Sequence, residues 1–325
     1  MRVARFAGNG VVEIQDAPLP RVAEGEVLLK VAYNGLCGSE RNAWQRGFPS
    51  VVGHETSGTI VDSNGTDVSV GTRCVTYLPV FCGECKFCQA GMTNCCVNRS
   101  AMVGWSPPWN GGYGEYMRVP AKCVLPIDDR VGLDEAVLLL DTIGTAWHAV
   151  RQARPAEAER ALVIGCGPLG LGVVAGLKAF GVPEVFACDL SPSRLAAAEE
   201  LGGRPVSPAD VPTLKGLQIA IEVVGTQPTI MQAIRAIEPM GRVVVLGEPH
   251  QPWAFEPTAE VVLRDFSFIR SWYFPLTEFA ENQQMLLDRK MDLKSLISHV
   301  FPLESLGEAF ELFWSGKTRK VLSQA

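Results

Sequence analysis

The segment from about residue 160 to residue 247 alternates strand-like and helix-like patterns, and this alternation limits the possible folds more than any other feature of the chain. Helical patterns begin near Gly170, Pro192 and Thr229. The apolar runs that flank them are typical of buried strands, and they read ALVIG, EVFACD, LQIAIEVV and RVVVLG. Strands that alternate with helices form a parallel sheet with helices on both faces. We therefore expect a doubly wound α/β domain over residues 149–278.

A glycine-rich turn follows the first of these strands and opens the first helix. The residues that define it are Gly165, Gly167, Pro168, Leu169 and Gly170. In such a turn the first glycine permits a sharp bend, the second lets the backbone approach a pyrophosphate, and the third packs the helix against the strand. The free N–H groups and the dipole of the helix N-terminus favour the phosphates. The strand–turn–helix context therefore predicts a dinucleotide site rather than a simple tight turn.

An acidic residue, Asp189, ends the next strand, about 20 residues beyond the turn. At this place a carboxylate accepts hydrogen bonds from the adenosine ribose and repels a 2′-phosphate. Neither Leu190 nor Ser191 supplies a positive charge that would attract that phosphate. The sequence thus predicts NAD rather than NADP. Arg194, one helical turn further on, either flanks the adenine or is a solvated residue on the helix face.

Ten cysteines are the unusual part of the composition, and five of them lie within residues 82–96. Four follow the pattern C-x2-C-x2-C-x7-C, and they are Cys82, Cys85, Cys88 and Cys96. A long chain without a secretory signal is better explained by metal binding than by disulfides. Four thiolates close a tetrahedral zinc site, so we expect a structural zinc in a lobe over about residues 80–98. An iron–sulfur cluster is the alternative.

A second group of potential metal ligands is scattered in the sequence. Cys37 stands in Gly-Leu-Cys-Gly-Ser, and His54 and Glu55 stand in Gly-His-Glu. Single cysteines and histidines are often ordinary core residues. One thiolate, one imidazole and one or two carboxylates, however, suit a zinc ion that keeps a position open for water or substrate.

The charge and hydropathy of the chain exclude several classes of partner. The 35 acidic and 29 basic residues give a formal net charge of −6, which disfavours nucleic acid and anionic membrane surfaces. No apolar run approaches the ~18 residues that a membrane span requires. We therefore expect a soluble, cytoplasmic protein whose partner is a small molecule.

In this order the motifs resemble those of the zinc-dependent medium-chain dehydrogenase/reductase family, in its alcohol and polyol dehydrogenase branch. The resemblance covers essentially the whole chain, from Gly-Leu-Cys-Gly-Ser and Gly-His-Glu through the cysteine lobe and Gly-Gly-Tyr-Gly-Glu-Tyr to the glycine turn. It implies a β-rich, GroES-like catalytic domain built from residues 1–148 and 279–325 around a Rossmann domain at 149–278. It also implies a homodimer or homotetramer. The β-rich start and the strand-like end of the chain agree with this arrangement.

The resemblance also implies roles for individual residues. The family has a third catalytic zinc ligand, Cys, Glu or Asp, about two dozen residues before the first glycine of the turn, and here this residue is Asp141. As an alternative, an aspartate after an apolar run is a common helix N-cap. Glu55 is then the exchangeable fourth ligand. Because Ser39 stands two residues after Cys37, we also expect it to accept the proton of the alcohol; the alternative is an ordinary solvated loop serine. Further cofactor contacts are expected, and they are Val224, Gly225, Leu246, Gly247 and Lys320, although a solvated terminal lysine explains Lys320 equally well.

Some positions depart from the family pattern or leave two interpretations open. Many relatives have a histidine three residues after the serine, whereas this chain has Asn42, which cannot titrate. The segment between Cys37 and His54 is short for the family. Four tryptophans either line the substrate cleft or belong to the core, and they are Trp44, Trp105, Trp109 and Trp147. His250 is expected on the surface or in a cofactor loop.

The sequence thus predicts an NAD-dependent and zinc-dependent dehydrogenase. Its substrate is a secondary alcohol, polyol, sugar or amino alcohol, and its product is the ketone or aldehyde. A zinc-free quinone or enoyl reductase uses the same scaffold but does not need the scattered ligand set. A zinc-stabilised protein that binds NAD(H) without catalysis is an alternative from another functional class.

Overall fold

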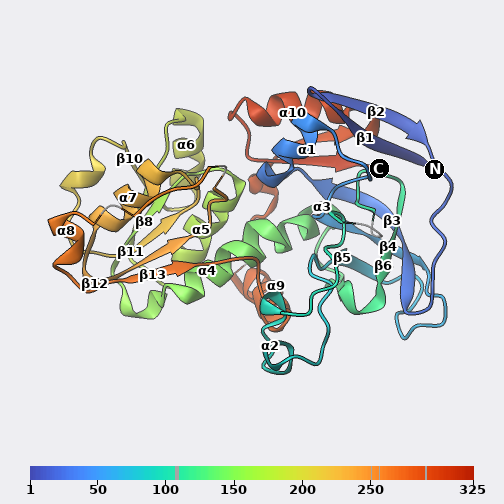
Figure 1. Cartoon of the computed structure of the whole chain (residues 1–325), viewed down its shortest axis with the longest axis horizontal. Coiled ribbons are helices and arrows are strands. Elements are labelled where there is room, and N and C mark those ends of the chain that lie inside the picture. Colours follow the sequence, from blue (N-terminus) through green and yellow to red (C-terminus); the bar gives the residue numbers. More distant parts are fainter. Residues whose placement is uncertain (107–109, 250, 256, 290) are drawn as a thin grey trace. The chain divides into compact units, whose positions relative to one another are not determined.

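The computed structural model describes residues 1–106, 110–249, 251–255, 257–289 and 291–325. The chain folds into two compact units (Figure 1). Unit 1 contains Met1–Leu140 and Phe274–Ala325, and unit 2 contains Asp141–Tyr273. Unit 2 therefore begins before the expected limit of residue 149. The reason is that Trp147, from the helix that follows Asp141, packs its ring 5.7 Å from that of Phe180 within unit 2.

Unit 1 is built around an irregular seven-stranded sheet to which both ends of the chain contribute. Its strands follow the order β14-β15-β3-β4-β5-β7, and β6 pairs with β3 beside this path. Their bounds are β3 Glu26–Gly35, β4 Thr56–Asp62, β5 Arg73–Thr76, β6 Tyr116–Pro120, β7 Val124–Pro126, β14 Ile297–Pro302 and β15 Lys320–Gln324. A separate hairpin consists of β1 (Arg2–Gly8) and β2 (Val11–Asp16). The β-rich character expected from the sequence is thus present in unit 1.

Short helices connect and cover the strands of unit 1. They are α1 Arg41–Arg46, α2 Lys86–Gln89, α3 Leu133–Ala136, α9 Thr277–Arg289 and α10 Leu306–Trp314. An aromatic cluster joins the hairpin to α10, because the ring of Phe310 lies 5.1 Å from that of Phe6 and 5.8 Å from that of Tyr113. Edge-to-face aromatic contacts of this kind stabilise a core beyond the apolar area that they bury.

Unit 2 is a parallel six-stranded sheet with the strand order β10-β9-β8-β11-β12-β13. The strands are β8 Arg160–Ile164, β9 Glu184–Cys188, β10 Arg204–Val206, β11 Leu217–Glu222, β12 Ile237–Val245 and β13 Ser267–Arg270. Numbered along the chain, this order is 3-2-1-4-5-6, the order of dinucleotide-binding domains. The sequence predicted the four central strands. It missed β10 and β13, which are short edge strands with mixed exposure.

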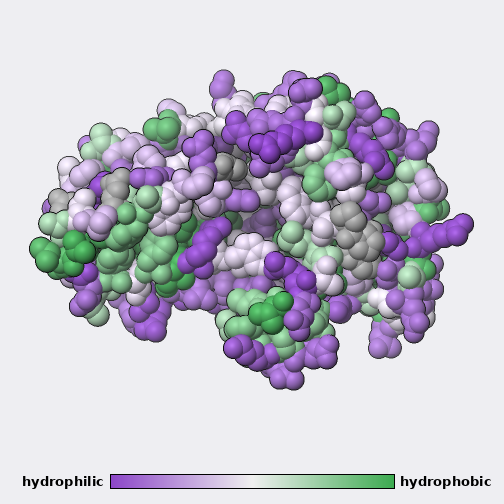
Figure 2. Space-filling model, viewed as in Figure 1, coloured by the Kyte–Doolittle hydropathy of each residue, from purple (hydrophilic) through white to green (hydrophobic). Residues whose placement is uncertain are grey.

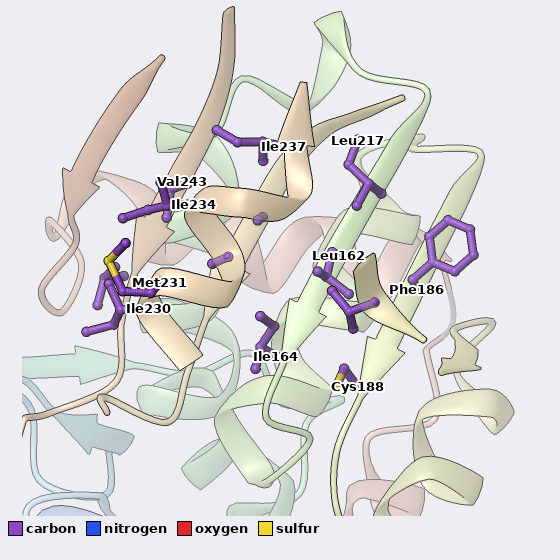
Figure 3. Packing of buried hydrophobic residues seen from close by; sticks show 14 of the residues in the cluster. Leu162, Ile164, Phe186, Cys188, Leu217, Ile230, Met231, Ile234, Ile237 and Val243 are labelled. Carbon is purple, nitrogen blue, oxygen red and sulfur yellow. The ribbon is translucent and has the colours of Figure 1, made fainter. Parts of the chain in front are cut away.

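The helices of unit 2 connect these strands, and they are α4 Ala146–Gln152, α5 Pro168–Ala179, α6 Pro192–Glu200, α7 Gln227–Ala236 and α8 Ala259–Val262. Right-handed crossovers place α5 and α6 on one face of the sheet and α7 on the other. Figure 3 shows the core beneath α7, where Ile230 and Ile234 of the helix lie over Leu162 and Val243 of the strands. All four side chains are fully buried. This packing fixes the strands whose ends carry the loops described below.

Exposed hydrophobic side chains gather at one end of unit 2. The space-filling view shows apolar surface over α8 (Figure 2), where Val262 and Leu263 are exposed. Contiguous apolar surface often marks a contact with another molecule. The homo-oligomer expected from the family resemblance stays a prediction. None of the helices in the described part of the chain has the length and hydrophobicity needed to cross a bilayer.

Candidate metal centres and cofactor site

The four cysteines of the lobe come together as expected. One ligand atom from each of Cys82, Cys85, Cys88 and Cys96 lies within 4.8 Å of the others. The Sγ atom of Cys88 is 3.9 Å from that of Cys82 and 3.6 Å from that of Cys85. Sulfur atoms bound to zinc at about 2.3 Å are roughly 3.8 Å apart at the edges of a tetrahedron. These two separations therefore match the spacing that a tetrahedral zinc ion requires.

Electrostatics favour the thiolate at two of the four cysteines of the lobe, whereas burial, together with the neighbouring cysteines, raises the pKa of Cys88 to about 12. Backbone N–H groups, first that of Cys88, lower the pKa of the Cys85 thiol from 9.0 to about 6. The pKa of Cys82 is lowered as well, by the backbone N–H of Cys85. The nearby Cys95 is exposed and is not part of the set. The four cysteines that we expected to be buried thiols are buried in the structure, and they are Cys74, Cys123, Cys166 and Cys188.

Strand pairing brings the scattered second group of ligands to one edge of the sheet in unit 1. Asn34 at the end of β3 pairs with Thr56 at the start of β4, and the Gly35 N–H donates to the carbonyl of Glu55 at 2.8 Å. Because the strands are antiparallel, the residue that follows β3 and the residues that precede β4 meet. These residues are Cys37, His54 and Glu55. His54 and Glu55 are buried.

Asp141 joins this group. It follows Leu140, the last residue of unit 1, directly along the chain and begins a single π-helical turn over Asp141–Thr145. Its Oδ1 accepts a hydrogen bond from Thr145 Oγ1 at 3.0 Å. The ligand atoms of Cys37, His54, Glu55 and Asp141 all lie within 4.8 Å of one another. The π-helical turn therefore begins at a possible metal ligand. Single π-turns within helices are frequent at functional sites.

Two buried residues that the sequence gave no role connect the candidate metal ligands. Glu40 is fully buried, and its Oε2 accepts hydrogen bonds from the backbone N–H of Cys37 at 3.1 Å and from Tyr113 Oη at 2.7 Å. Its Oε1 lies 3.4 Å from His54 Nδ1. Burial and the neighbouring Glu40 raise the pKa of Tyr113 well above its usual value, so Tyr113 stays a hydrogen-bond donor. Glutamate three residues after a turn-opening residue is a capping-box pattern, which was the signal available in the sequence.

The other predicted residues near this group have defined partners. The Ser39 hydroxyl donates to Cys37 Sγ at 3.3 Å. Lys320, expected to contact the cofactor, begins β15 and donates from Nζ to Glu55 Oε1 at 2.5 Å in a buried ion pair. Its contact with a cofactor stays a prediction, as does the proton transfer by Ser39. The long sequence separation between Lys320 and Glu55 explains why the sequence did not reveal the pair.

The cofactor residues expected in unit 2 lie at the carboxyl edge of its sheet. Gly165 follows β8 with a φ of +95°, and Gly167 is the N-cap of α5. A Cβ atom on Gly170 would lie 1.8 Å from the Gly165 carbonyl oxygen, so only glycine permits this packing of helix on strand. At Gly167 the closest atoms belong to the Arg194 guanidinium at 4.0 Å. The backbone there is open to a pyrophosphate at the helix N-terminus.

Asp189 stands at the end of β9, as the sequence predicted. Its two carboxylate oxygens accept hydrogen bonds from the backbone N–H groups of Cys166 at 2.7 Å and Ser191 at 2.8 Å. Arg194 Nη1 lies 3.9 Å from Asp189 Oδ2. A carboxylate has about four acceptor positions, so Asp189 keeps capacity for ribose hydroxyls. The two groups of metal-ligating side chains therefore suit zinc ions, and the glycine turn together with Asp189 suits a dinucleotide.

Comparisons with known proteins agree with this geometry. A family model described as an alcohol dehydrogenase GroES-like domain matches residues 23–129, and one described as a zinc-binding dehydrogenase matches residues 168–288. L-threonine 3-dehydrogenase of Bacillus subtilis strain 168 is 31% identical over 336 residues, covering 95% of this chain and 94% of that protein. The chain belongs to the zinc-dependent medium-chain dehydrogenase family.

Two further relatives of this dehydrogenase are informative. D-xylulose reductase A of Aspergillus oryzae is 27% identical, covering 96% of this chain and 93% of that protein. The crystal structure of an alcohol dehydrogenase from Escherichia coli CFT073, complexed with NADH, superposes with a TM-score of 0.89 at 26% identity. That match covers 100% of this chain and 99% of the other. The expected GroES-like and Rossmann folds are confirmed, and the protein is an oxidoreductase of the zinc-type alcohol dehydrogenase class.

The tryptophans of this dehydrogenase have different surroundings. Trp105 lies beside the ligand group, with its ring 5.8 Å from that of His54 and stacked on Phe48. Trp147 is fully buried in the core of unit 2, and Trp44 packs against Trp314. Of the expected aromatic wall, the described residues therefore place only Trp105 next to a ligand. Trp109 and His250 lie outside the described residues.

Proposed function

We propose that this protein is an NAD-dependent dehydrogenase that oxidises a secondary alcohol, polyol, sugar or amino alcohol to the ketone or aldehyde. The observation that carries the proposal is the convergence of Cys37, His54, Glu55 and Asp141, whose ligand atoms lie within 4.8 Å of one another. A small adjustment of these side chains would bring them to the ~2.0–2.3 Å that zinc requires. Because a zinc-free quinone or enoyl reductase has no use for this set, the set favours an alcohol dehydrogenase.

In this proposal Cys37, His54 and Asp141 hold the catalytic zinc, and Glu55 is an exchangeable fourth ligand. When bound, the zinc supplies Lewis-acid activation of the alcohol oxygen, and NAD supplies a hydride acceptor. Glu40, whose Oε1 lies 3.4 Å from His54 Nδ1, would help to hold the His54 ring in place for the metal. The Ser39 hydroxyl, beside Cys37 Sγ, accepts the alcohol proton and passes its own proton on.

The preference for NAD is supported by the charge at the end of β9. A 2′-phosphate would meet the carboxylate of Asp189, and the nearby cation Arg194 already faces that carboxylate. The relative solved with NADH has the same fold. Two relatives are named for L-threonine, an amino acid with a secondary hydroxyl group, and for D-xylulose, a ketose whose reduction gives a polyol. We therefore place amino-substituted secondary alcohols and polyols first among the substrates.

The test combines metal analysis with a substrate panel. We expect about two zinc ions per chain, one for each tetrad. Asp141→Ala should retain the zinc of the cysteine lobe, lose the other, and abolish NAD reduction measured by NADH absorbance. NADH binding and the thermal transition of unit 2 should persist.

Other outcomes would contradict the proposal. One zinc ion per wild-type chain, or two zinc ions per chain in Asp141→Ala, would contradict the assignment of Asp141 as a ligand of the catalytic zinc. Two zinc ions in the wild type together with no NAD reduction across secondary alcohols, polyols, sugars and amino alcohols would favour a protein that binds NAD(H) without catalysis. An exposed carboxylate variant in unit 2, Asp210→Ala, serves as the control and should match the wild type in zinc content and turnover.

A further inference from the structure

The proposal above assigns no role to one buried carboxylate in unit 2. Glu222 is the last residue of β11 and is fully buried. In the parallel sheet it pairs with Ile164, the last residue of β8, and with Val245, the last residue of β12. Glu222 therefore stands at the centre of the carboxyl edge, where open α/β sheets bind their ligands.

The side chain of Glu222 holds the loop that follows its own strand. Its Oε1 accepts three hydrogen bonds, each of 2.8 Å, from the backbone N–H groups of Val224 and Gly225 and from Thr229 Oγ1. Thr229 lies in the first turn of α7. One oxygen atom thus fixes the direction in which the chain leaves β11 and enters the helix.

The main chain of Glu222 holds the neighbouring loop after β12. Its carbonyl oxygen accepts hydrogen bonds from the backbone N–H groups of Leu246 at 2.8 Å and Gly247 at 3.2 Å. The two loops also touch each other without spare room. A Cβ atom on Gly225 would lie 2.5 Å from the Glu248 carbonyl oxygen, and one on Gly247 would lie 2.0 Å from the Gly225 nitrogen. A displacement of either loop therefore moves the other.

Burying a carboxylate in this position has a cost. Burial raises the pKa of Glu222, while the N–H groups of Gly225 and Val224 and the Thr229 hydroxyl counteract the shift. The positive charge of Arg270, at the end of β13, also favours the ionised form. Replacing buried charged groups with apolar residues is often neutral or stabilising, so a buried carboxylate is weak support for stability alone. Glu222 instead makes its hydrogen bonds to the two loops that follow β11 and β12 at the carboxyl edge of the sheet.

The strand order shows which half of a dinucleotide these loops face. The glycine turn after β8 and Asp189 after β9 receive the pyrophosphate and the adenosine. The loops after β11 and β12 lie on the other side of β8 in the sheet. In a domain with this strand order, the second mononucleotide binds there. These loops contain Val224, Gly225, Leu246 and Gly247.

We propose that Glu222 is a positioning residue that fixes the two loops receiving the nicotinamide half of the cofactor. The inference rests on the proposed use of NAD. It predicts a selective loss: without the carboxylate, the adenosine half still binds, and the nicotinamide half loses its preformed surface.

The experiment compares two ligands on the full-length, zinc-containing protein. The Kd values of NADH and of ADP, which has only the adenosine half and the pyrophosphate, are measured by calorimetry. Glu222→Leu removes the acceptor and keeps the volume. We expect its Kd for NADH to rise about tenfold or more, because three hydrogen bonds to the loop are lost. Its Kd for ADP should stay within about twofold of the wild-type value.

Three variants keep the test decisive. Glu222→Gln retains an acceptor oxygen and should recover most of the NADH affinity. Thr229→Val removes one of the three bonds and should weaken NADH by about threefold, which tests the proposal even where Glu222→Leu does not fold. Glu238→Gln is the matched control, because Glu238 lies near the other end of β12 and accepts from Gln218. It should change neither Kd.

Each result is informative. Equal losses for NADH and ADP, or no loss for either, would overturn the positioning role of Glu222. Failure of the wild type to bind NADH at all would instead contradict the proposed function, so the two failures are distinguishable.

Discussion

At the scale of single residues, Glu40 connects the side chain of one proposed metal ligand to the backbone of another. It faces His54 Nδ1 with one oxygen and holds the backbone N–H of Cys37 with the other. Tyr113 donates to this second oxygen from the interior of unit 1. Partners of this kind orient the ligands and tune the metal, although they do not bind it.

We expect Glu40→Gln to weaken zinc binding at the Cys37 group. The side-chain amide of glutamine has one acceptor oxygen and one NH2 donor group. Either His54 Nδ1 or the Tyr113 hydroxyl would therefore face the NH2 group instead of an acceptor oxygen. Loss of such partners typically lowers metal affinity by ~10–100-fold. Competition with a chromophoric chelator measures the affinity of the more weakly bound zinc, and the zinc of the cysteine lobe is an internal reference.

Tyr113→Phe should move zinc affinity in the same direction by a smaller factor, since it removes only the hydrogen bond to Glu40. Tyr116→Phe, three residues further along in β6, is the matched control. Unchanged zinc affinity in Glu40→Gln would show that Glu40 contributes only to packing.

At the scale of elements, the cysteine lobe is attached to the start of α9. Thr93, between the third and fourth cysteines, accepts from the Leu276 N–H and bonds to Tyr77. Tyr77 in turn donates to the Phe274 carbonyl. A metal bound by the four cysteines would therefore order a loop that joins two distant segments of unit 1.

Cys85→Ser should remove the zinc of this lobe and lower the melting temperature of unit 1. Without metal the lobe loses the cross-link that holds Thr93 in place, and we expect a decrease of about 5 °C or more by calorimetry. Cys95→Ser is the control, because Cys95 belongs to the same loop and lies outside the tetrad. A melting temperature unaffected by Cys85→Ser would argue against a structural role for the metal.

Asp189→Asn tests the cofactor preference set at the end of β9. The amide retains an acceptor oxygen for the turn and removes the charge that repels a 2′-phosphate. The ratio of kcat/KM for NAD to that for NADP should fall by about tenfold. Asp210→Asn, on an exposed turn of the same unit, should leave the ratio unchanged, and an unchanged ratio in Asp189→Asn would contradict the ribose contact.

The sequence predicted the elements whose signals are local. The glycine turn, the acid after the second strand and the cysteine spacing each occupy one short segment, and the structure places them as expected. Contacts between distant segments could not be predicted in this way. Lys320 meets Glu55 only because β15 pairs with β3, and Tyr113 meets Glu40 only after the sheet has formed. The edge strands β10 and β13 were missed because they are too short and polar for a clear pattern.

At the scale of the whole molecule, carboxylates paired with arginines determine how stability depends on pH. Arg2 lowers the pKa of Glu115 through its backbone N–H and its guanidinium, and the Arg160 side chain lowers that of Glu184. A carboxyl whose pKa is lower in the folded state stabilises the fold above its unfolded pKa. This stabilisation is lost as the pH falls through the folded pKa.

Glu222 has the opposite sign, because burial raises its pKa in the folded state. Its contribution to stability is complete below the unfolded pKa of about 4.3 and is lost as the pH rises through the folded value. Ionisation of the buried Glu222 carboxyl therefore reduces stability as the pH rises, whereas ionisation of the carboxyls paired with arginines increases it. In unit 2, Glu184 and Glu222 therefore change the melting temperature in opposite directions as the pH rises.

This balance predicts how two variants change the pH profile of unit 2 in calorimetry between pH 3 and pH 8. In Glu184→Gln the melting temperature should be slightly lower at pH 7 and should fall less steeply below pH 4.5, because the ion pairs with Arg160 and Arg204 no longer titrate.

In Glu222→Gln the loss of stability that ionisation of Glu222 causes above its unfolded pKa should disappear. The variant should therefore gain stability relative to the wild type as the pH rises. Parallel profiles for the wild type and Glu184→Gln would show that this carboxylate carries none of the acid sensitivity. A Glu222→Gln difference that does not change with pH would mean that Glu222 has the same pKa in the folded and unfolded chain.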